Sequence, residues 1–444
     1  MYRRTPTRAL ITAFAALSAL VVPAAGASAA NLWVSNSATV SSPENSCAHP
    51  GYNSIQSAIA AAGSGTVQVC TGTYTEQLTI VKPVKLSAAN GAGTARVVLP
   101  SNPAVSTTAC DAASLKGLKK LEVEQGNPES DAQPDENALS ICTSGTVSIT
   151  GLTFEPKWPG GTCYDSLYGI LVGGGATLKA TDVTVDGGGA SPINGCQGGV
   201  AIQIGMAWSS PVEPGHATLS QDTVTEYQKN GITVDGHGST AKITNSTITG
   251  AGATPETAQN GIQVSNGAGA TISSSSVSAN ECDNASCGPD AFTDTQATGI
   301  LFYGAAAGSK VTSSTLKEND IGFYLVSDSP TQPTSAEATI EKDVLSGDRY
   351  EGVALDQGDA FLKEDTISGP GNIGIDLFQY EGQTYAPTSS GSHDAISGMS
   401  GAGVKVESDN LPGDHPGSFT LTGSTLSGNA QALLDESTTF TVLL

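Results

Sequence analysis

Two carboxylates near the C-terminal end of the chain have the spacing that hydrolysis of a glycosidic bond requires. Asp356 follows Gly352 by four residues, and Asp376 follows Gly374 by two, in two segments of similar pattern. If these segments are adjacent strands of one sheet, about 4.8 Å between strands and about 6.6 Å along the strand put the carboxylates roughly 8 Å apart. An inverting glycosidase holds its acid and base about 6.5–9.5 Å apart.

We therefore predict that Asp356 and Asp376 form a catalytic acid/base pair, with Arg349 as a supporting cation. The alternative is that both are ordinary solvated carboxylates. The chain has 42 acidic residues against 19 basic ones, so two acidic side chains can be neighbours without a shared task.

A second candidate for proton transfer is the run Asp235-Gly-His237-Gly. Its Gly-His-Gly part resembles one motif of polygalacturonases, and Asp-x-His resembles the spacing found in alginate epimerases. The paired-aspartate and Arg-x-Lys motifs of the former and the Asp-Pro-His-Glu motif of the latter are absent. The alternative for Asp235 and His237 is a turn with an exposed histidine.

Side chains that could bind a sugar recur in the same Gly-Ile-x-Val segments. Alternation in a strand turns Ile and Val inward and the residues between them outward, where they flank a column of glycines. Aromatic faces take the C–H face of a sugar ring, and amides or carboxylates take its hydroxyls. The predicted substrate-binding residues are Gln203, Gln263, Tyr303, Tyr324, Arg349 and Phe378.

A repeat supplies the elements that must position these residues. Pairs of apolar residues stand five positions apart, with a Ser, Thr or Asp between them, as in Ile243/Ile248, Ile272/Val277 and Leu362/Ile367. A unit this short cannot bury a face alone, so stacked coils must share a column of Ile, Val and Leu. The repeat predicts an all-β fold, a single-stranded right-handed parallel β-helix.

The unit resembles the parallel β-helix repeat of the pectate-lyase-like superfamily, over roughly residues 50–440. The stretch Tyr52-Asn-Ser-Ile-Gln-Ser-Ala-Ile-Ala and the turn Gly72-Thr-Tyr74-Thr-Glu76 are similar to the short N-terminal capping helix and following turn of that group. The resemblance implies fold rather than activity, because the group hosts lyases, hydrolases, esterases, epimerases and non-enzymes. Further pectin methylesterase motifs are absent, so we reject esterase activity and expect Tyr74 and Glu76 to be structural.

The eight cysteines predict disulfides, since an even count in an exported chain is typical of them. We expect pairing in sequence order, among Cys47, Cys70, Cys110, Cys142, Cys163, Cys196, Cys282 and Cys287. No zinc-site spacing is present, and we predict no metal site and no cofactor. The loop from Glu281 to Cys287 has oxygen ligands of the kind that bind calcium, but a small disulfide-closed insert explains it as well.

Residues 1–30 have the pattern of a signal peptide: a basic start, an apolar run and the small residues Ala27-Ser-Ala29. The alternative is an uncleaved anchor. Residues 31–444 are then one β-helix domain, secreted and extracellular. Residues 101–140 break the repeat and predict a long loop insertion tied by Cys110 and Cys142.

Without the first 30 residues the formal net charge falls from −23 to −26. Such a surface repels phosphate backbones and anionic lipids, which argues against nucleic acid and membrane partners. Only two arginines follow residue 30, Arg96 and Arg349, so the sequence offers no basic patch for a polyanionic substrate. We expect a monomer and a polysaccharide partner.

Two functions fit these observations. The first is a secreted protein that binds or processes a neutral or weakly charged extracellular polysaccharide, as a glycoside hydrolase or lyase. The second is a non-catalytic extracellular scaffold or surface protein. An exposed aromatic row on the Gly-Ile face favours the first, and aromatic residues tucked away under loops favour the second.

Overall fold

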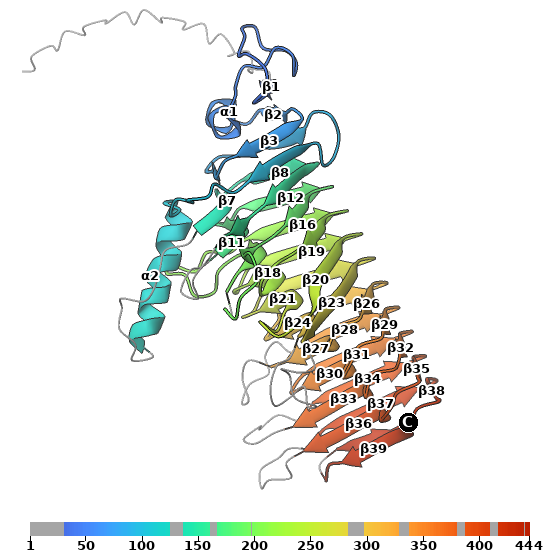
Figure 1. Cartoon of the computed structure of the whole chain (residues 1–444). Helices are drawn as coiled ribbons and strands as arrows, with labels where there is room; N and C mark the ends of the chain where they lie inside the picture. The colour runs from blue at the N-terminus through green and yellow to red at the C-terminus, as the bar shows by residue number, and fades with distance from the viewer. Residues whose placement is uncertain are drawn as a thin grey trace, which may run out of the picture.

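The chain forms a right-handed parallel β-helix whose coils stack along one axis (Figure 1). The computed structural model describes residues 31–124, 136–159, 167–196, 198–282, 297–327, 337–379, 387–408, 416–438 and 440–444. Three long parallel sheets, here named A, B and C, run the length of the solenoid, and a full coil gives one strand to A, then C, then B. The fold predicted from the repeat is confirmed.

Sheet A has 14 strands. They are β1 (Asn31–Val34), β2 (Thr66–Val69), β5 (Lys85–Ala88), β8 (Thr146–Thr150), β12 (Thr177–Thr181), β16 (His216–Ser220), β19 (Thr240–Thr244), β22 (Gly269–Ser273), β25 (Ser309–Thr312), β28 (Glu337–Glu341), β31 (Asp359–Lys363), β34 (Thr388–Ser392), β37 (Ser418–Thr422) and β40 (Thr441–Leu443).

Sheet B has 12 strands and contains the Gly-Ile-x-Val segments. They are β4 (Leu78–Ile80), β7 (Glu136–Cys142), β11 (Leu167–Gly173), β15 (Val200–Ile204), β18 (Asn230–Asp235), β21 (Asn260–Ser265), β24 (Thr298–Tyr303), β27 (Ile321–Val326), β30 (Glu351–Asp356), β33 (Ile373–Gln379), β36 (Ala402–Ser408) and β39 (Gln431–Glu436).

Sheet C also has 12 strands, and β10 (Lys157–Trp158) pairs separately with β14 (Gly189–Ala190). The strands of sheet C are β3 (Gly72–Thr75), β6 (Ala95–Val98), β9 (Leu152–Glu155), β13 (Thr184–Asp186), β17 (Thr223–Thr225), β20 (Thr247–Thr254), β23 (Ser276–Cys282), β26 (Thr315–Lys317), β29 (Val344–Ser346), β32 (Thr366–Ser368), β35 (Ala395–Ser397) and β38 (Thr425–Ser427).

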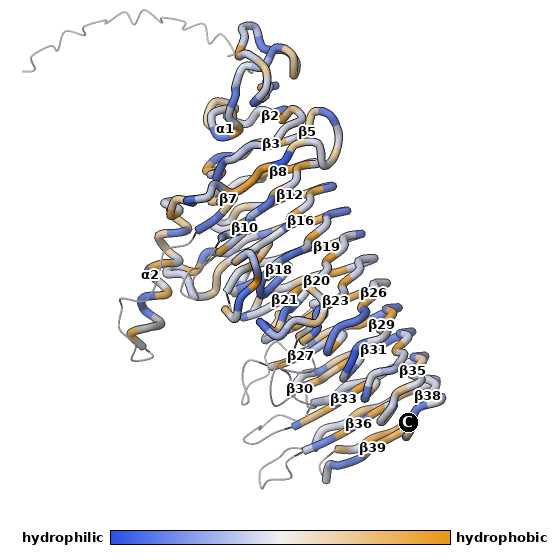
Figure 2. Tube along the Cα trace, in the orientation of Figure 1, coloured by the Kyte–Doolittle hydropathy of each residue, from blue (hydrophilic) through white to orange (hydrophobic). Residues whose placement is uncertain are grey.

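The core is a set of apolar columns inside the coils. Ile232, Ile262 and Ile300 lie in register on successive strands of sheet B and are fully buried. Hydropathy alternates along the strands, as Figure 2 shows, because each pleat turns successive side chains to opposite faces. Each coil therefore buries its apolar side chains only against the coils next to it.

The corner between sheets A and C explains the five-residue gap of the repeat. A residue with positive φ, such as Asn245 at 52°, turns the chain between the inward Ile243 and Ile248. The next residue, Ser246, accepts a hydrogen bond from the backbone N–H of Asp222 in the preceding coil at 3.2 Å. Equivalent bonds follow along the corner through side chains of Ser275, Ser314, Asp343, Asp365, Asp394 and Ser424. We call this series the corner ladder.

A short helix, α1 (Ile55–Ala62), covers the N-terminal end of the core, as the resemblance implies. Its first backbone N–H groups, on Ile55 and Gln56, donate to the carboxylate of Glu76 at 2.9 Å each. The hydroxyl of buried Tyr74 donates to the carbonyl of Cys70 at 2.9 Å. Both residues of the Gly-x-Tyr-x-Glu turn are therefore structural, as expected.

The insertion differs from the expected loop. Residues Ala109–Glu124 form helix α2, which lies beside β7 and β11 (Figure 1). Asp111 fixes its start, accepting hydrogen bonds from the Thr108 backbone N–H at 2.9 Å and from Asn137 Nδ2 at 2.7 Å. Strand β7 begins at Glu136, so only residues 125–135 of the insertion lie outside the described residues.

Two disulfides have the predicted pairing, Cys47–Cys70 and Cys110–Cys142. Cys196 and Cys282 are also disulfide-bonded, and their predicted partners, Cys163 and Cys287, lie outside the described residues, as does the proposed signal peptide. No helix among the described residues is long and apolar enough to cross a membrane.

Candidate functional site

The outward face of sheet B has the register that the sequence predicts. Asp376 lies beside Ala354 on the adjacent strand, and Asp356 lies beside Phe378. The two carboxylates therefore come from neighbouring strands, β30 and β33, two positions apart along the strand. Strand spacing of about 4.8 Å and two residues of about 3.3 Å each give roughly 8 Å between these positions.

Helix α2 and the segment 205–215 cover the N-terminal end of this face. Leu171 and Tyr168 pack with Cys110 and Met206 in a small apolar cluster there. Gln203, a predicted sugar ligand, is 1% exposed, and its Nε2 donates to the carbonyl of Gly205 at 2.7 Å. Its amide is used within its own coil and does not face an open groove.

The middle of the face carries a connected polar network. Asn260 donates to Asn230 at 3.0 Å, and Asn230 donates to Gln263 and to Thr233 at 3.0 Å each. Gln263 in turn donates to Ser265 at 3.3 Å. Of these five side chains, only that of Gln263 is partly exposed. The members of the network therefore bond mainly to one another, and Gln263 is the one that a ligand could reach.

Asp235 belongs to the same network and is 1% exposed. Its carboxylate accepts from the backbone N–H of Ala207 at 2.7 Å, from Ser265 at 2.9 Å and from Asn266 at 2.7 Å. Burial raises its pKa, although these donors oppose the rise. His237 is exposed beyond the strand. Asp235 thus ties three segments together, and the proton-transfer role predicted for it with His237 stays a prediction.

The three predicted aromatic platforms are not alike. Tyr303 is 42% exposed at the end of β24. Tyr324 and Phe378 are buried and pack on each other, with ring centroids 6.2 Å apart, beside Ile321 and Ala354. A sugar can therefore reach Tyr303 directly, while the other two rings stabilise the face.

Asp376 lies next to a cation that the sequence reasoning did not single out. Lys405, its neighbour on β36, places Nζ 3.8 Å from Asp376, 2.6 Å from Glu407 and 3.8 Å from Glu436. Asp376 is 1% exposed, whereas Asp356 is partly exposed. Burial alone would lower the pKa of Lys405, but the carboxylates outweigh it and raise that pKa. The repeat could have predicted this contact, because aligned coils place Lys405 at the same strand position as Asp376, one coil later.

Arg349 has a different partner from the one predicted. Its Nη2 lies 2.6 Å from Asp320 Oδ1, and its guanidinium lies 4.7 Å from the ring centre of Tyr350. Arg349 precedes β30, and Asp356 is the last residue of that strand. At a rise of about 3.3 Å per residue, the two positions are more than about 15 Å apart along the strand, so Arg349 does not support Asp356 as predicted. Burial raises the pKa of Asp320 to about 6, although Arg349 lowers it in part.

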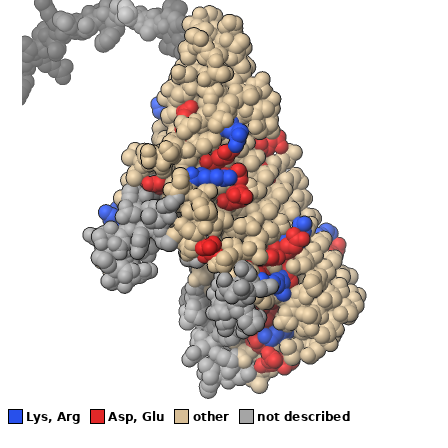
Figure 3. Space-filling view, viewed as in Figure 1, with Lys and Arg blue, Asp and Glu red and all other residues tan. Residues whose placement is uncertain are grey.

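Charge pairing of this kind is common on the face of the molecule shown in Figure 3, where blue and red side chains lie next to one another. Among the described residues, no group of three or more His, Cys, Asp or Glu side chains could hold a metal ion. Most of the candidate calcium loop, from Asp283 to Cys287, lies outside the described residues.

Comparisons with known proteins agree with the fold. A family model described as a right-handed β-helix region matches residues 212–389. No curated protein sequence matches the chain significantly.

Solved structures of similar fold include the catalytic unit of a thermostable GH87 α-1,3-glucanase from Streptomyces thermodiastaticus, at 12% identity and TM-score 0.53, covering 88% of this chain and 64% of that one. The Agl-KA catalytic domain is 11% identical, with TM-score 0.53 and coverage of 87% and 64%. A point mutant of the periplasmic alginate epimerase AlgG is 10% identical, with TM-score 0.48 and coverage of 84% and 79%. Likeness at this level of identity extends to the fold alone.

Proposed function

We propose that this chain is a secreted β-helix protein that binds a polysaccharide on the outward face of sheet B and hydrolyses it at Asp356 and Asp376. One observation carries the proposal: the two carboxylates lie on adjacent strands, two positions apart, in register. The separation of roughly 8 Å expected from that register leaves room for a water molecule between acid and base.

We assign different roles to the two carboxylates because their surroundings differ. Burial on its own disfavours the charged form of Asp376, but the Lys405 ammonium 3.8 Å away favours it, so we assign Asp376 as the base that takes a proton from the attacking water. Asp356 is the more exposed of the two and can reach the glycosidic oxygen, so we assign it as the acid that gives its proton to that oxygen. The water oxygen bonds to the anomeric carbon as the glycosidic bond breaks, and the configuration at that carbon inverts.

The charge of the site indicates the class of substrate. Asp376, Glu407 and Glu436 lie within 4.0 Å of the Lys405 ammonium, and Asp356 lies on the strand next to that of Asp376. This excess of negative charge repels uronic acid polymers and favours a neutral glycan. Exposed Tyr303 supplies a ring face, and Gln263 supplies an amide for sugar hydroxyls.

Product formation from neutral polysaccharides tests the proposal. The wild-type protein should release reducing ends, and an Asp356→Asn/Asp376→Asn variant should lose at least about a hundredfold in rate. A Glu337→Gln/Glu364→Gln variant removes two exposed carboxylates outside sheet B and should keep wild-type activity. Equal activity in all three proteins, or none in the wild type, would contradict hydrolysis at this pair.

A specific observation also favours the second candidate, a non-catalytic extracellular scaffold. Asp376 and Phe378 are each 1% exposed and Tyr324 is 7% exposed, so much of the predicted groove is filled by the protein itself. In that case the wild type releases no product from any glycan. Binding without product, abolished by Tyr303→Ala, would indicate a carbohydrate-binding protein.

A further inference from the structure

The outward face of sheet A differs in charge from the rest of this acidic protein. Over six consecutive strands, β8, β12, β16, β19, β22 and β25, the outward positions hold hydroxyls, lysines, one histidine and one glycine, and no Asp or Glu. These positions are Thr146, Ser148, Thr150, Thr177, Lys179, Thr181, His216, Thr218, Ser220, Thr240, Lys242, Thr244, Gly269, Thr271, Ser273, Lys310 and Thr312. We call this surface the hydroxyl–lysine face.

Its central column alternates between lysine and threonine. Lys179 lies beside Thr218, which lies beside Lys242. Lys242 lies beside Thr271, which lies beside Lys310. At about 4.8 Å per strand, the three lysines stand in line about 9.6 Å apart.

These three lysines are exposed and make no ion pair or hydrogen bond in the part of the chain that the structure describes. Five other lysines, by contrast, lie within 4.0 Å of a carboxylate: Lys157, Lys317, Lys342, Lys363 and Lys405. An unpaired ammonium in a strongly acidic protein is a local site for an anion, because no internal carboxylate competes for it.

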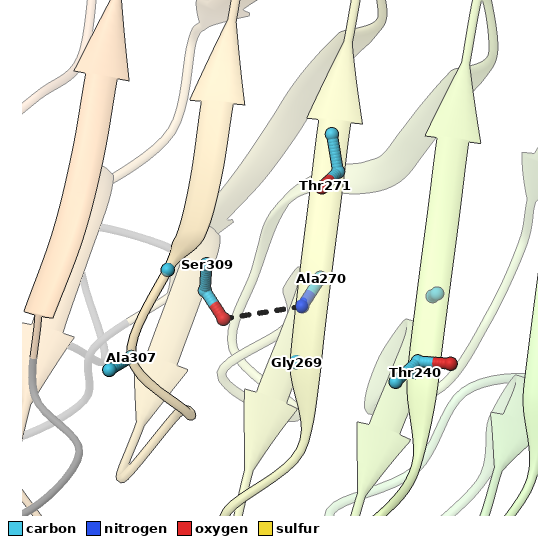
Figure 4. A pocket seen from close by; sticks show the side chains of 8 residues that line it. Thr240, Gly269, Ala270, Thr271, Ala307 and Ser309 are labelled. Atoms are coloured by element: carbon cyan, nitrogen blue, oxygen red, sulfur yellow. Dashed lines mark hydrogen bonds between the residues drawn. The ribbon is translucent and has the colours of Figure 1, made fainter.

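A hollow of about 190 Å³ lies at one edge of the hydroxyl–lysine face, where β19, β22 and β25 begin. Gly269 supplies no side chain between Thr240 and Gly308, and Thr271 borders the hollow on its strand (Figure 4). Ser309 closes the floor by accepting a hydrogen bond from the Ala270 backbone N–H at 3.2 Å (Figure 4). Thr271 stands between Lys242 and Lys310, so the hollow adjoins two of the three cations.

We propose that the hydroxyl–lysine face binds a linear acidic polysaccharide whose carboxylates recur about every 10 Å, twice the strand spacing. The lysines pair with the carboxylates, and the threonine and serine hydroxyls bond the sugar hydroxyls between them. A nucleic acid fits less well, because its phosphates recur about every 3.4 Å along a strand, much more closely than the lysines. The face lies on a different sheet from Asp356 and Asp376 and does not depend on the proposed hydrolysis.

Binding of fluorescent hyaluronan, a linear polymer with a carboxylate on every second sugar, tests this face. The wild-type protein should bind at low salt, and the affinity should fall as salt rises because the contacts are ionic. A Lys179→Gln/Lys242→Gln/Lys310→Gln variant should lose at least about tenfold in affinity, as three exposed charge contacts are removed.

The matched control is Lys317→Gln/Lys342→Gln/Lys363→Gln, which changes the net charge equally but alters only lysines already paired with carboxylates. It should bind hyaluronan within about twofold of the wild type, and circular dichroism should show both variants folded. Absence of wild-type binding, or an equal loss in both variants, would overturn the proposal. Single-stranded DNA bound as tightly as hyaluronan through the same lysines would overturn its assignment to a polysaccharide.

Discussion

At the scale of single residues, Lys405 connects stability with the proposed chemistry. It is the one cation within 4.0 Å of Asp376 among the described ion pairs, and it also contacts Glu407 and Glu436. A buried carboxylate is costly unless a counter-ion or hydrogen bonds compensate it. The same ammonium that favours the ionised form of Asp376, the proposed base, therefore also makes its burial tolerable.

Lys405→Met should lower the free energy of unfolding by about 2 kcal/mol. The loss is below the 3–5 kcal/mol of a fully buried pair because Lys405 is partly exposed. Urea denaturation at pH 7 measures it, and Lys363→Met, which removes a surface pair with Glu341, should cost under about 1 kcal/mol. Equal costs for the two variants would mean that Asp376 does not depend on Lys405.

At the scale of elements, the corner ladder places buried carboxylates in line. Asp343 accepts from the Ser314 N–H, Asp365 from the Asp343 N–H, and Asp394 from the Asp365 N–H. Burial, together with repulsion from Asp343 and Asp394, raises the pKa of Asp365 to about 8, although backbone donors oppose the rise. Burial likewise raises the pKa of Asp343 to about 7.

The ladder should make the fold less stable as the pH rises. A carboxyl with a raised pKa binds its proton more tightly in the folded chain, so its stabilisation is complete below the unfolded pKa of about 4 and is lost towards pH 7–8. The midpoint temperature of thermal unfolding should therefore decrease as the pH is raised from about 5 to about 8.

An Asp365→Ser variant should reduce this pH dependence, since serine holds the same ladder position at 246, 275 and 314 without a charge. Glu337→Gln, which removes an exposed carboxyl of sheet A, should leave the dependence unchanged. If the midpoint rises between pH 5 and pH 8 in the wild type, the ladder aspartates are ionised throughout and stabilise the fold as anions.

The strands and turns could be predicted where their formation depends on residues close to them in the sequence. The five-residue gap of Ile243/Ile248 and the alternation of the Gly-Ile strands are local, and they fixed the coil register down to Asp356 and Asp376. Helix α2 was missed because its place depends on contacts across the chain. The Ser210 N–H donates to the carbonyl of Ala113 at 2.9 Å, and Gly117 lies against the Trp208 backbone.

In the candidate site, too, the contacts set by the repeat could be predicted and the others could not. Column neighbours such as Asp376 and Lys405 can be read from the repeat, since strands pair in order. The partner of Arg349 could not, because Asp320 lies outside the strands, at the start of the preceding coil. Nor could burial of Gln203, which results from the segment that follows it.

At the scale of the whole molecule, the solenoid is a one-dimensional stack. The fully buried side chains of Ile262 and Ile300 are paired on neighbouring strands, whereas Ile375 lies three strands beyond Ile300 in the same sheet. In such a stack the stability is close to a sum of coil and interface contributions. Effects of core changes should therefore extend to the next coil and little further.

Double-mutant cycles test this. Ile262→Val, Ile300→Val and Ile375→Val should each cost about 1 kcal/mol. The pair Ile262→Val/Ile300→Val should deviate from additivity by more than about 0.5 kcal/mol, and Ile262→Val/Ile375→Val should add within that margin. Strong coupling in the distant pair, measured by chemical denaturation, would show that packing changes spread through the whole stack.

The alternation of lysine and threonine on sheet A has an evolutionary consequence. The fold repeats with every coil, but the pattern Lys179, Thr218, Lys242, Thr271, Lys310 repeats with every second coil. Duplication or loss of one coil can preserve the core and still put two lysines, or two threonines, side by side. Within the run from β12 to β25, a lineage that keeps this alternation must gain or lose coils in pairs.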